Sequence, residues 1–238
     1  MKNYGQFCPV AKAAEVVAER WTPLILRELM MGSRRYSEIQ AGVRLMSRTM
    51  LVQRLNELVE SGTIEARRGN GRGHDYVLTA AGEAFRPVIE AMSAWGQSWG
   101  QGRLGPKDVD AEALMWNMRR HIDPAFIRRQ RLTVRLEFSG MPVARVSRRT
   151  WWLVIGPTDV EVCFKNPGYD VNVVVVADLY AFTRTWLGYT GVAEVSDQVR
   201  FEGPRDEVAY AREILNLPDK AHHRHFVFQP RMANVAAA

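Results

Sequence analysis

Cysteine is scarce in this chain of 238 residues, which contains only Cys8 and Cys163. The two are far apart in the sequence, so we expect them to lie in different domains and to form no disulfide framework. Long apolar runs are also missing. A run such as 173–177 has the length of a strand, whereas a membrane-spanning helix needs about 18 apolar residues. The N-terminus lacks the charged and apolar segments of a secretory signal, and a reducing cytoplasm fits these features.

Motifs of catalysis and metal binding are missing as well. The sequence shows no nucleophile elbow, zinc-protease motif or phosphate-binding loop. Isolated carboxylates such as Asp178 are better explained as helix caps. His222, His223 and His225 lie close together, but without an acidic or cysteine partner at ligand spacing a solvated basic segment is favoured. We therefore expect no enzyme activity, no metal and no cofactor.

Charge is only moderately unbalanced: 32 basic and 26 acidic residues give a net charge of +6. The hydrophobic fraction of 47% is typical of globular proteins, and the length suits two domains of about 100 to 130 residues. The parts before and after Gly100 each carry +3, so total charge does not tell which part meets a polyanion. Between Arg34 and Arg72, however, eight arginines accompany four glutamates, which favours nucleic-acid contact there.

Apolar residues at helical spacing dominate the first part of the chain. Thr22 is expected to cap one helix, with Pro23 in its first position, and Ser47 is expected to cap another that ends before Gly62. After Gly62 the period changes to two, which predicts a hairpin with a glycine-rich tip. Thr79 is expected to cap one last helix, whose apolar stripe contains Phe85, Val88, Ile89, Met92, Trp95 and Trp99. The predicted helices are 10–19, 22–31, 37–42 and 47–61, and the predicted strands are 64–68 and 75–78.

A short helix, a turn, a four-turn helix and a hairpin, in this order, are typical of a winged helix-turn-helix that binds double-stranded DNA. With Leu51 at the centre of the buried face, residues 48, 49, 52 and 53 face solvent at the start of the helix. Arginine and glutamine there suit base edges, valine suits a thymine methyl group, and hydroxyls and flanking arginines suit phosphates. An amphipathic helix of an unrelated domain would show a polar face too, but the arginine-bearing hairpin favours DNA binding. The candidate DNA-binding residues are Arg35, Ser37, Ser47, Arg48, Thr49, Val52, Gln53, Arg54, Arg67, Arg72 and His74.

Residues 8–100 resemble the HxlR family of winged-helix regulators, which are distant relatives of the MarR type. The resemblance implies a homodimer built from the first helix and the helix after the wing. Some HxlR members use an N-terminal cysteine to sense oxidants, which makes Cys8 a redox candidate here, since a helix dipole and Lys12 favour its thiolate. A small buried thiol is the alternative. The stretches that carry the resemblance are Cys8–Val10, Arg20–Leu29, Gly32–Ile39, Ser47–Leu55 and Tyr76–Gly82.

The HxlR family usually has a single domain, so the second part of this chain needs its own explanation. We predict a DNA-binding and dimerisation domain over 1–100, a linker over 101–111 and an α+β domain over 112–238 with a mostly antiparallel sheet covered by helices. The expected helices are 114–120, 179–187 and 206–215. The expected strands are 132–138, 142–147, 150–155, 159–164, 171–176 and 199–202.

Residues 112–216 resemble the sterol-carrier-protein-type fold through the segments 151–155, 173–178, 182–188 and 199–204. The resemblance implies an apolar effector, fatty acyl or sterol-like, between sheet and helices. A filled core that serves as a spacer or dimerisation module is the alternative. A lipid-transfer protein whose winged helix binds other proteins is a second function in a different class. The candidate ligand-binding residues are Phe138, Trp151, Leu153, Phe164, Val174, Phe182 and Trp186.

Overall fold

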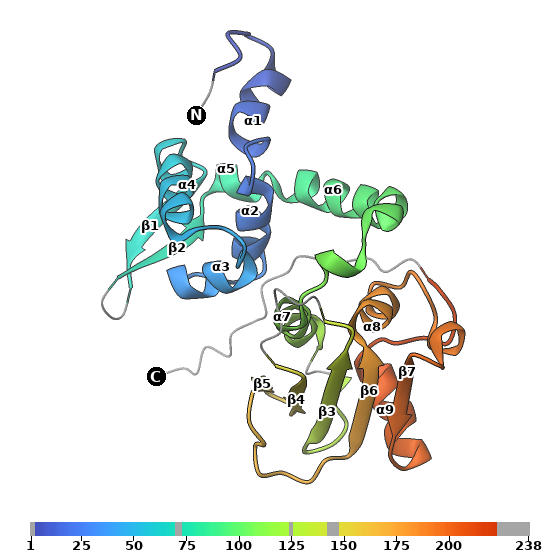
Figure 1. The fold of residues 1–238 in the computed structure, drawn as a ribbon. Helices are drawn as coiled ribbons and strands as arrows, with labels where there is room; N and C mark the ends of the chain where they lie inside the picture. The colour runs from blue at the N-terminus through green and yellow to red at the C-terminus, as the bar shows by residue number, and fades with distance from the viewer. Residues whose placement is uncertain (1–2, 70–72, 124–125, 142–147, 223–238) are drawn as a thin grey trace. The chain divides into compact units, whose positions relative to one another are not determined.

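The structure is a computed structural model that describes residues 3–69, 73–123, 126–141 and 148–222 (Figure 1). The chain divides into two compact units, and the division falls between Ala94 and Trp95. The first unit is helical with one hairpin, and the second contains a five-stranded sheet with helices. No helix in the described part of the chain has the length and apolar character that crossing a bilayer requires.

The first unit contains the expected winged helix-turn-helix. Ser47 caps α4 by accepting a hydrogen bond from the backbone N–H of Met50 at 3.2 Å, as predicted. Thr22 was predicted as a cap, but Trp21 holds that position with φ of 78°, and Thr22 is the first helical residue. The elements are α1 (Pro9–Val17), α2 (Thr22–Met30), α3 (Tyr36–Gly42), α4 (Arg48–Glu60), β1 (Ile64–Arg68), β2 (His74–Leu78), α5 (Ala80–Glu83) and α6 (Arg86–Trp99).

The single helix predicted after the hairpin is two helices. Thr79 caps α5 as expected, with its hydroxyl accepting from the N–H of Gly82 at 3.2 Å. The helix stops at Glu83 and a new one begins at Arg86. Pro87 explains the break, because proline lacks an N–H and is tolerated only in the first turn of a helix.

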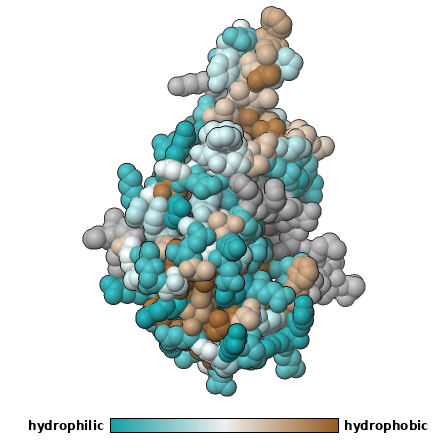
Figure 2. All heavy atoms as spheres, turned by 90° about the vertical axis from the view of Figure 1, so that its right-hand side faces the viewer, coloured by the Kyte–Doolittle hydropathy of each residue, from teal (hydrophilic) through white to brown (hydrophobic). Residues whose placement is uncertain are grey.

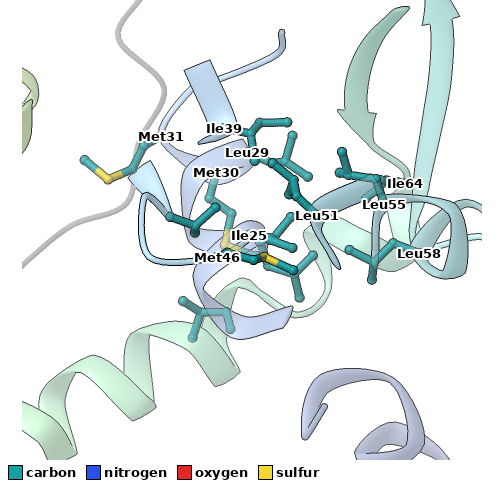
Figure 3. Close-up of a cluster of buried hydrophobic side chains, with 13 residues drawn as sticks. Ile25, Leu29, Met30, Met31, Ile39, Met46, Leu51, Leu55, Leu58 and Ile64 are labelled. Atoms are coloured by element: carbon teal, nitrogen blue, oxygen red, sulfur yellow. The ribbon is translucent and has the colours of Figure 1, made fainter. Parts of the chain in front are cut away.

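The core of the first unit is formed by α2, α3, α4 and β1 (Figure 3). Leu51, Leu55 and Leu58 lie on one face of α4 and are at most 1% exposed. They pack with side chains of α2 such as Ile25 and with Ile64 of the hairpin. This burial fixes which face of α4 remains in solvent, as the apolar spacing predicted.

The second unit contains a mixed sheet with strand order β5-β4-β3-β6-β7. Three neighbouring pairs are antiparallel, whereas β3 and β6 run parallel, so the mostly antiparallel sheet expected from short connections is a mixed one. The expected strand 142–147 lies outside the described residues. The elements are α7 (Ala111–His121), β3 (Leu132–Ser139), β4 (Thr150–Ile155), β5 (Val160–Cys163), β6 (Val173–Asp178), α8 (Leu179–Trp186), β7 (Val199–Glu202) and α9 (Arg205–Ile214), with short 3-10 helices at 101–103, 106–108 and 192–195.

One face of this sheet is apolar and packs against α8. Phe138 of β3 contacts Phe182 of α8, with ring centroids 5.6 Å apart. Asp178 caps α8 through the N–H of Ala181 at 3.0 Å, which confirms its predicted role. The strand register places Leu136 beside both Trp151 and Val175, so these side chains share the face.

Candidate nucleic-acid interface

The start of α4 presents a polar face to solvent. Arg48, Thr49, Val52 and Gln53 are exposed, and Val52 has an exposed fraction of 47%. Leu51 between them is completely buried. The guanidinium of Arg48 has no hydrogen-bonding or ionic partner among the described residues, so it is available to an incoming acceptor. The structure thus brings together the residues predicted to meet DNA on this helix.

Gln53 is held by a neighbour on its own helix. Its amide nitrogen donates to Oε1 of Glu57 at 3.1 Å. This bond orients the exposed amide along α4, and it has to be exchanged before the nitrogen donates to a base.

The surroundings of Arg54 do not suit the phosphate contact predicted for it. Its guanidinium is paired with Glu57 at 2.5 Å and with Glu19 at 3.3 Å, and only 13% of its side chain is exposed. An arginine engaged by two carboxylates has little capacity for a phosphate. The structure therefore assigns Arg54 to holding α4 against the segment between α1 and α2, which contains Glu19.

The hairpin is a regular antiparallel ladder in which Arg67 is opposite Asp75 and Arg68 is opposite His74. Arg67 is exposed and its guanidinium lies 2.9 Å from Oε2 of Glu65. His74 is exposed. Arg72, the predicted contact at the tip, lies outside the described residues. The described strands thus carry three basic side chains, each on the surface.

The hairpin is attached to the helix-turn-helix by backbone contacts. The N–H of Tyr76 donates to the carbonyl of Arg34 at 2.8 Å, and Arg35 forms a β-bridge with Asp75. Arg35 and Ser37, at the start of α3, are exposed beside this junction. The two backbone contacts therefore join the wing and α3 into one body.

Burial, and secondarily the nearby Tyr36, raises the pKa of the Tyr76 phenol.

A buried carboxylate of α2, which pairs with the neighbouring arginine of the same helix, was not predicted from the sequence. Glu28 is fully buried, and its Oε1 lies 2.8 Å from Nη2 of Arg27. The same nitrogen donates to the carbonyl of Gly42 at 3.3 Å, at the end of α3. The sequence contains only a weak indication of this site. The apolar stripe of α2 places residue 28 near the core, but the partners of Glu28 are set by tertiary packing.

Cys8 occupies the N-cap position of α1 and is half-buried. Its carbonyl accepts from the N–H of Lys12 at 3.1 Å. The Lys12 ammonium lies 3.0 Å from Glu15. The helix N-terminus thus stands beside the thiol as expected, whereas the lysine charge is paired with a carboxylate.

Most candidate ligand-binding residues of the second unit are buried in its core. Phe164 is the exception, with 48% exposed. Val174 does not share the face of Val173 and Val175, because neighbouring residues of a strand point to opposite sides, and it is only half-buried. The remaining residues are at most 5% exposed: Phe138, Trp151, Leu153, Phe182 and Trp186.

No metal-binding cluster of three or more His, Cys, Asp or Glu side chains is found within the described ranges. His223 and His225, considered above as ligands, lie outside those ranges, and His222 lies inside.

The helix-turn-helix, its exposed polar helix and its basic hairpin define a DNA-binding transcriptional regulator. Residues 16–103 match the family described as HxlR-like helix-turn-helix, and the chain belongs to this family. The HTH-type transcriptional regulator YvaP of Bacillus subtilis is 33% identical over 100 residues, which cover 41% of this chain and 93% of YvaP.

Two further relatives match a similar share of the chain. Rv3095 of Mycobacterium tuberculosis, also described as an HTH-type transcriptional regulator, is 35% identical over 41% of this chain and 62% of its own length. The crystal structure of diamide-treated YodB from B. subtilis is 31% identical, covers 40% of this chain and 96% of that chain, and has a TM-score of 0.34.

Proposed function

We propose that this regulator works as a homodimer in the cytoplasm, with α4 in the major groove and the hairpin on the adjacent backbone. The observation that supports this most is the exposed start of α4 beside a basic hairpin joined to the same body. Arg48 and Gln53 would contact base edges, and Val52 would contact a thymine methyl group. The phosphate contacts would come from Arg35, Ser37, Ser47, Thr49, Arg67, Arg72 and His74.

An exposed apolar stripe supports dimerisation. Val88, Met92, Trp95 and Trp99 follow each other at spacings of four, three and four along α6, and their exposed fractions range from 42% to 73%. Phe7 and Val10, near the N-terminus, are also exposed. Figure 2 shows hydrophobic residues at its upper end, where Figure 1 places α1. Such stripes are covered in stable proteins, and a second copy would cover them here. In a symmetric dimer of this kind, half-sites about 10 bp apart are expected.

Control by an apolar ligand is the second part of the proposal. Residues 112–238 would form a sterol-carrier-protein-type domain after the linker 101–111, which contains two 3-10 helices. A ligand that binds the DNA-competent and the incompetent form with different affinity would change the separation of the two α4 helices in the dimer. The relatives are transcriptional regulators, which disfavours the lipid-transfer alternative.

Gel-shift assays with genomic fragments test the proposal. We expect the double variant Arg48→Ala/Gln53→Ala to lose selectivity, since each bidentate base contact is worth about 1–3 kcal/mol. Arg72→Ala should weaken binding to every sequence alike and reduce the salt dependence. Arg200→Ala removes an exposed arginine of β7 and serves as the control with the same loss of charge. Unchanged selectivity of the double variant would refute the assignment of α4 to the groove.

A further inference from the structure

A depression lies where β4 begins and β5 ends, and it includes one of the predicted ligand-binding residues. It has a volume of about 450 Å³, is open to solvent on one side, and is lined by Arg148, Cys163, Phe164 and Lys165. Ligand pockets of small molecules usually measure about 300–1,000 Å³. Phe164 is the one residue that this lining shares with the predicted apolar site.

The wall of the depression is aromatic. Half of the Phe164 side chain is exposed, and its ring meets the buried ring of Trp151 edge-on, with centroids 5.3 Å apart. The guanidinium carbon of Arg148 lies 4.5 Å from the centroid of the Phe164 ring. Trp151 donates from Nε1 to the carbonyl of Arg148 at 3.3 Å, which fixes the backbone at this point. The guanidinium therefore occupies one face of the Phe164 ring, and a flat apolar group would pack against the part of the ring that remains exposed, next to this cation.

Neither cation of the depression has a carboxylate partner in the part of the chain that the structure describes. The guanidinium of Arg148 and the ammonium of Lys165 are exposed, and neither pairs with an acidic side chain within the described ranges. Elsewhere in this unit arginines do have such partners, for example Arg129 with Glu207 and Arg212 with Asp219. Two unneutralised cations beside an exposed ring favour a ligand that is anionic at one end and apolar at the other.

The shape of the depression restricts the apolar part of the ligand. A long acyl chain gains most of its binding free energy from enclosure on all sides. The predicted interior residues such as Leu153 and Phe182 are completely buried, and the depression is open. A compact planar ring makes a large contact with a shallow aromatic wall, so it suits this site better than a long chain.

We infer that the depression lined by Arg148, Phe164 and Lys165 binds a small aromatic carboxylate, whose ring stacks at Phe164 and whose carboxylate accepts hydrogen bonds from Arg148 and Lys165. The inference rests on the proposed ligand control, for which it names the site and the chemical class of the effector.

Calorimetry on the full chain with sodium 2-naphthoate as the probe tests the site. We expect one binding site per chain, with affinity reduced about tenfold by Arg148→Gln and by Lys165→Gln, the loss expected for one charge-assisted hydrogen bond. Arg149→Gln is the matched control, because it removes the charge of the next residue, which is exposed and outside the lining, and should change affinity less than twofold. The neutral analogue 2-naphthalenemethanol and the aliphatic octanoate should both bind at least tenfold more weakly.

Three results would overturn the inference: no binding of 2-naphthoate at millimolar concentration, equal binding of the neutral analogue, or equal affinity of Arg148→Gln, Lys165→Gln and the unmodified chain. Circular dichroism of the variants shows whether they are folded. The gel-shift assay with and without 2-naphthoate separates the two proposals. Binding that depends on Arg148 and Lys165 but leaves DNA affinity unchanged supports the site and refutes its control of the regulator.

Discussion

Glu28 and Gly42 share one small space between α2 and α3: a Cβ atom at position 42 would lie 1.9 Å from the carboxyl carbon of Glu28. The carboxylate is fully buried and paired with Arg27, which also bonds to the carbonyl of Gly42. Glu28 therefore cannot move aside without losing its partner in a site closed to water. The close approach of the two helices depends on the missing side chain at position 42.

We expect Gly42→Ala to lower the free energy of unfolding by about 1–3 kcal/mol, the usual cost of overpacking a closed site. Urea denaturation followed by circular dichroism measures the change. Gly96→Ala is the matched control: Gly96 lies within α6, and a Cβ there would meet no atom within 4 Å. Alanine is the better helix former by up to about 1 kcal/mol, so this variant should be as stable as the unmodified chain or more so. If Gly42→Ala were as stable as the unmodified chain, the Glu28 side chain would be able to shift at little cost in free energy.

Arg54→Ala should affect stability and not the salt dependence of DNA binding. The substitution leaves Glu19 and Glu57 without their cation, and we expect a loss of about 1–3 kcal/mol in unfolding free energy. The slope of log affinity against log salt concentration should stay unchanged. A slope smaller by about 0.9 would instead identify Arg54 as a phosphate contact. Arg48→Ala, at an exposed site, should keep its stability within about 0.5 kcal/mol.

Alkaline pH should destabilise the first unit through Tyr76. Burial and the neighbouring Tyr36 raise the pKa of Tyr76, so the folded state favours the neutral phenol. Its contribution is complete below the unfolded pKa of about 10 and is lost as pH rises through the higher folded value. Burial also raises the pKa of Tyr189, so absorbance at 295 nm should show late-titrating tyrosines of which Tyr76→Phe removes one. If the variant and the unmodified chain give the same titration curve above pH 10, the buried phenol is not Tyr76.

Cys8 and Cys163 should differ in their reaction with peroxide. Cys8 occupies the N-cap position of α1 and is half-buried. Burial, and secondarily Glu161, raises the pKa of Cys163, which keeps it as the less reactive thiol. We propose that mild peroxide oxidises Cys8 first and changes DNA affinity, as mass spectrometry and gel shifts of the same samples will show. Oxidation of Cys163 before Cys8, or unchanged DNA binding after oxidation of Cys8, contradicts a sensing role.

Features with local causes were predicted well from the sequence. Ser47 and Gly62 define α4 because a cap and a left-handed residue act within one turn of the helix. The hairpin follows from the change of period after Gly62. The break between α5 and α6 at Pro87 also has a local cause. It was not predicted because the apolar stripe continues across the break.

Features set by distant partners were not predictable in the same way. Arg54 finds Glu19, which is 35 positions away, only after α4 has packed. The parallel pairing of β3 with β6 depends on which strands are neighbours, and short connections indicate only the antiparallel pairs. The side of the sheet on which Val174 lies could not be predicted, because residues 173–176 are all valine and no polar residue marks the register of the strand.

The bond from Tyr76 to the carbonyl of Arg34 has a consequence for the spacing of the proposed DNA contacts. The hairpin is bonded to the start of α3 and shares a buried cluster with α4, so in the proposed complex the packing of this unit sets the distance between the groove contact and the backbone contact. The DNA duplex would have to deform until its groove and backbone match the spacing of these contacts. Base steps that neither element touches therefore influence the choice of operator, through the stiffness and groove width that they confer.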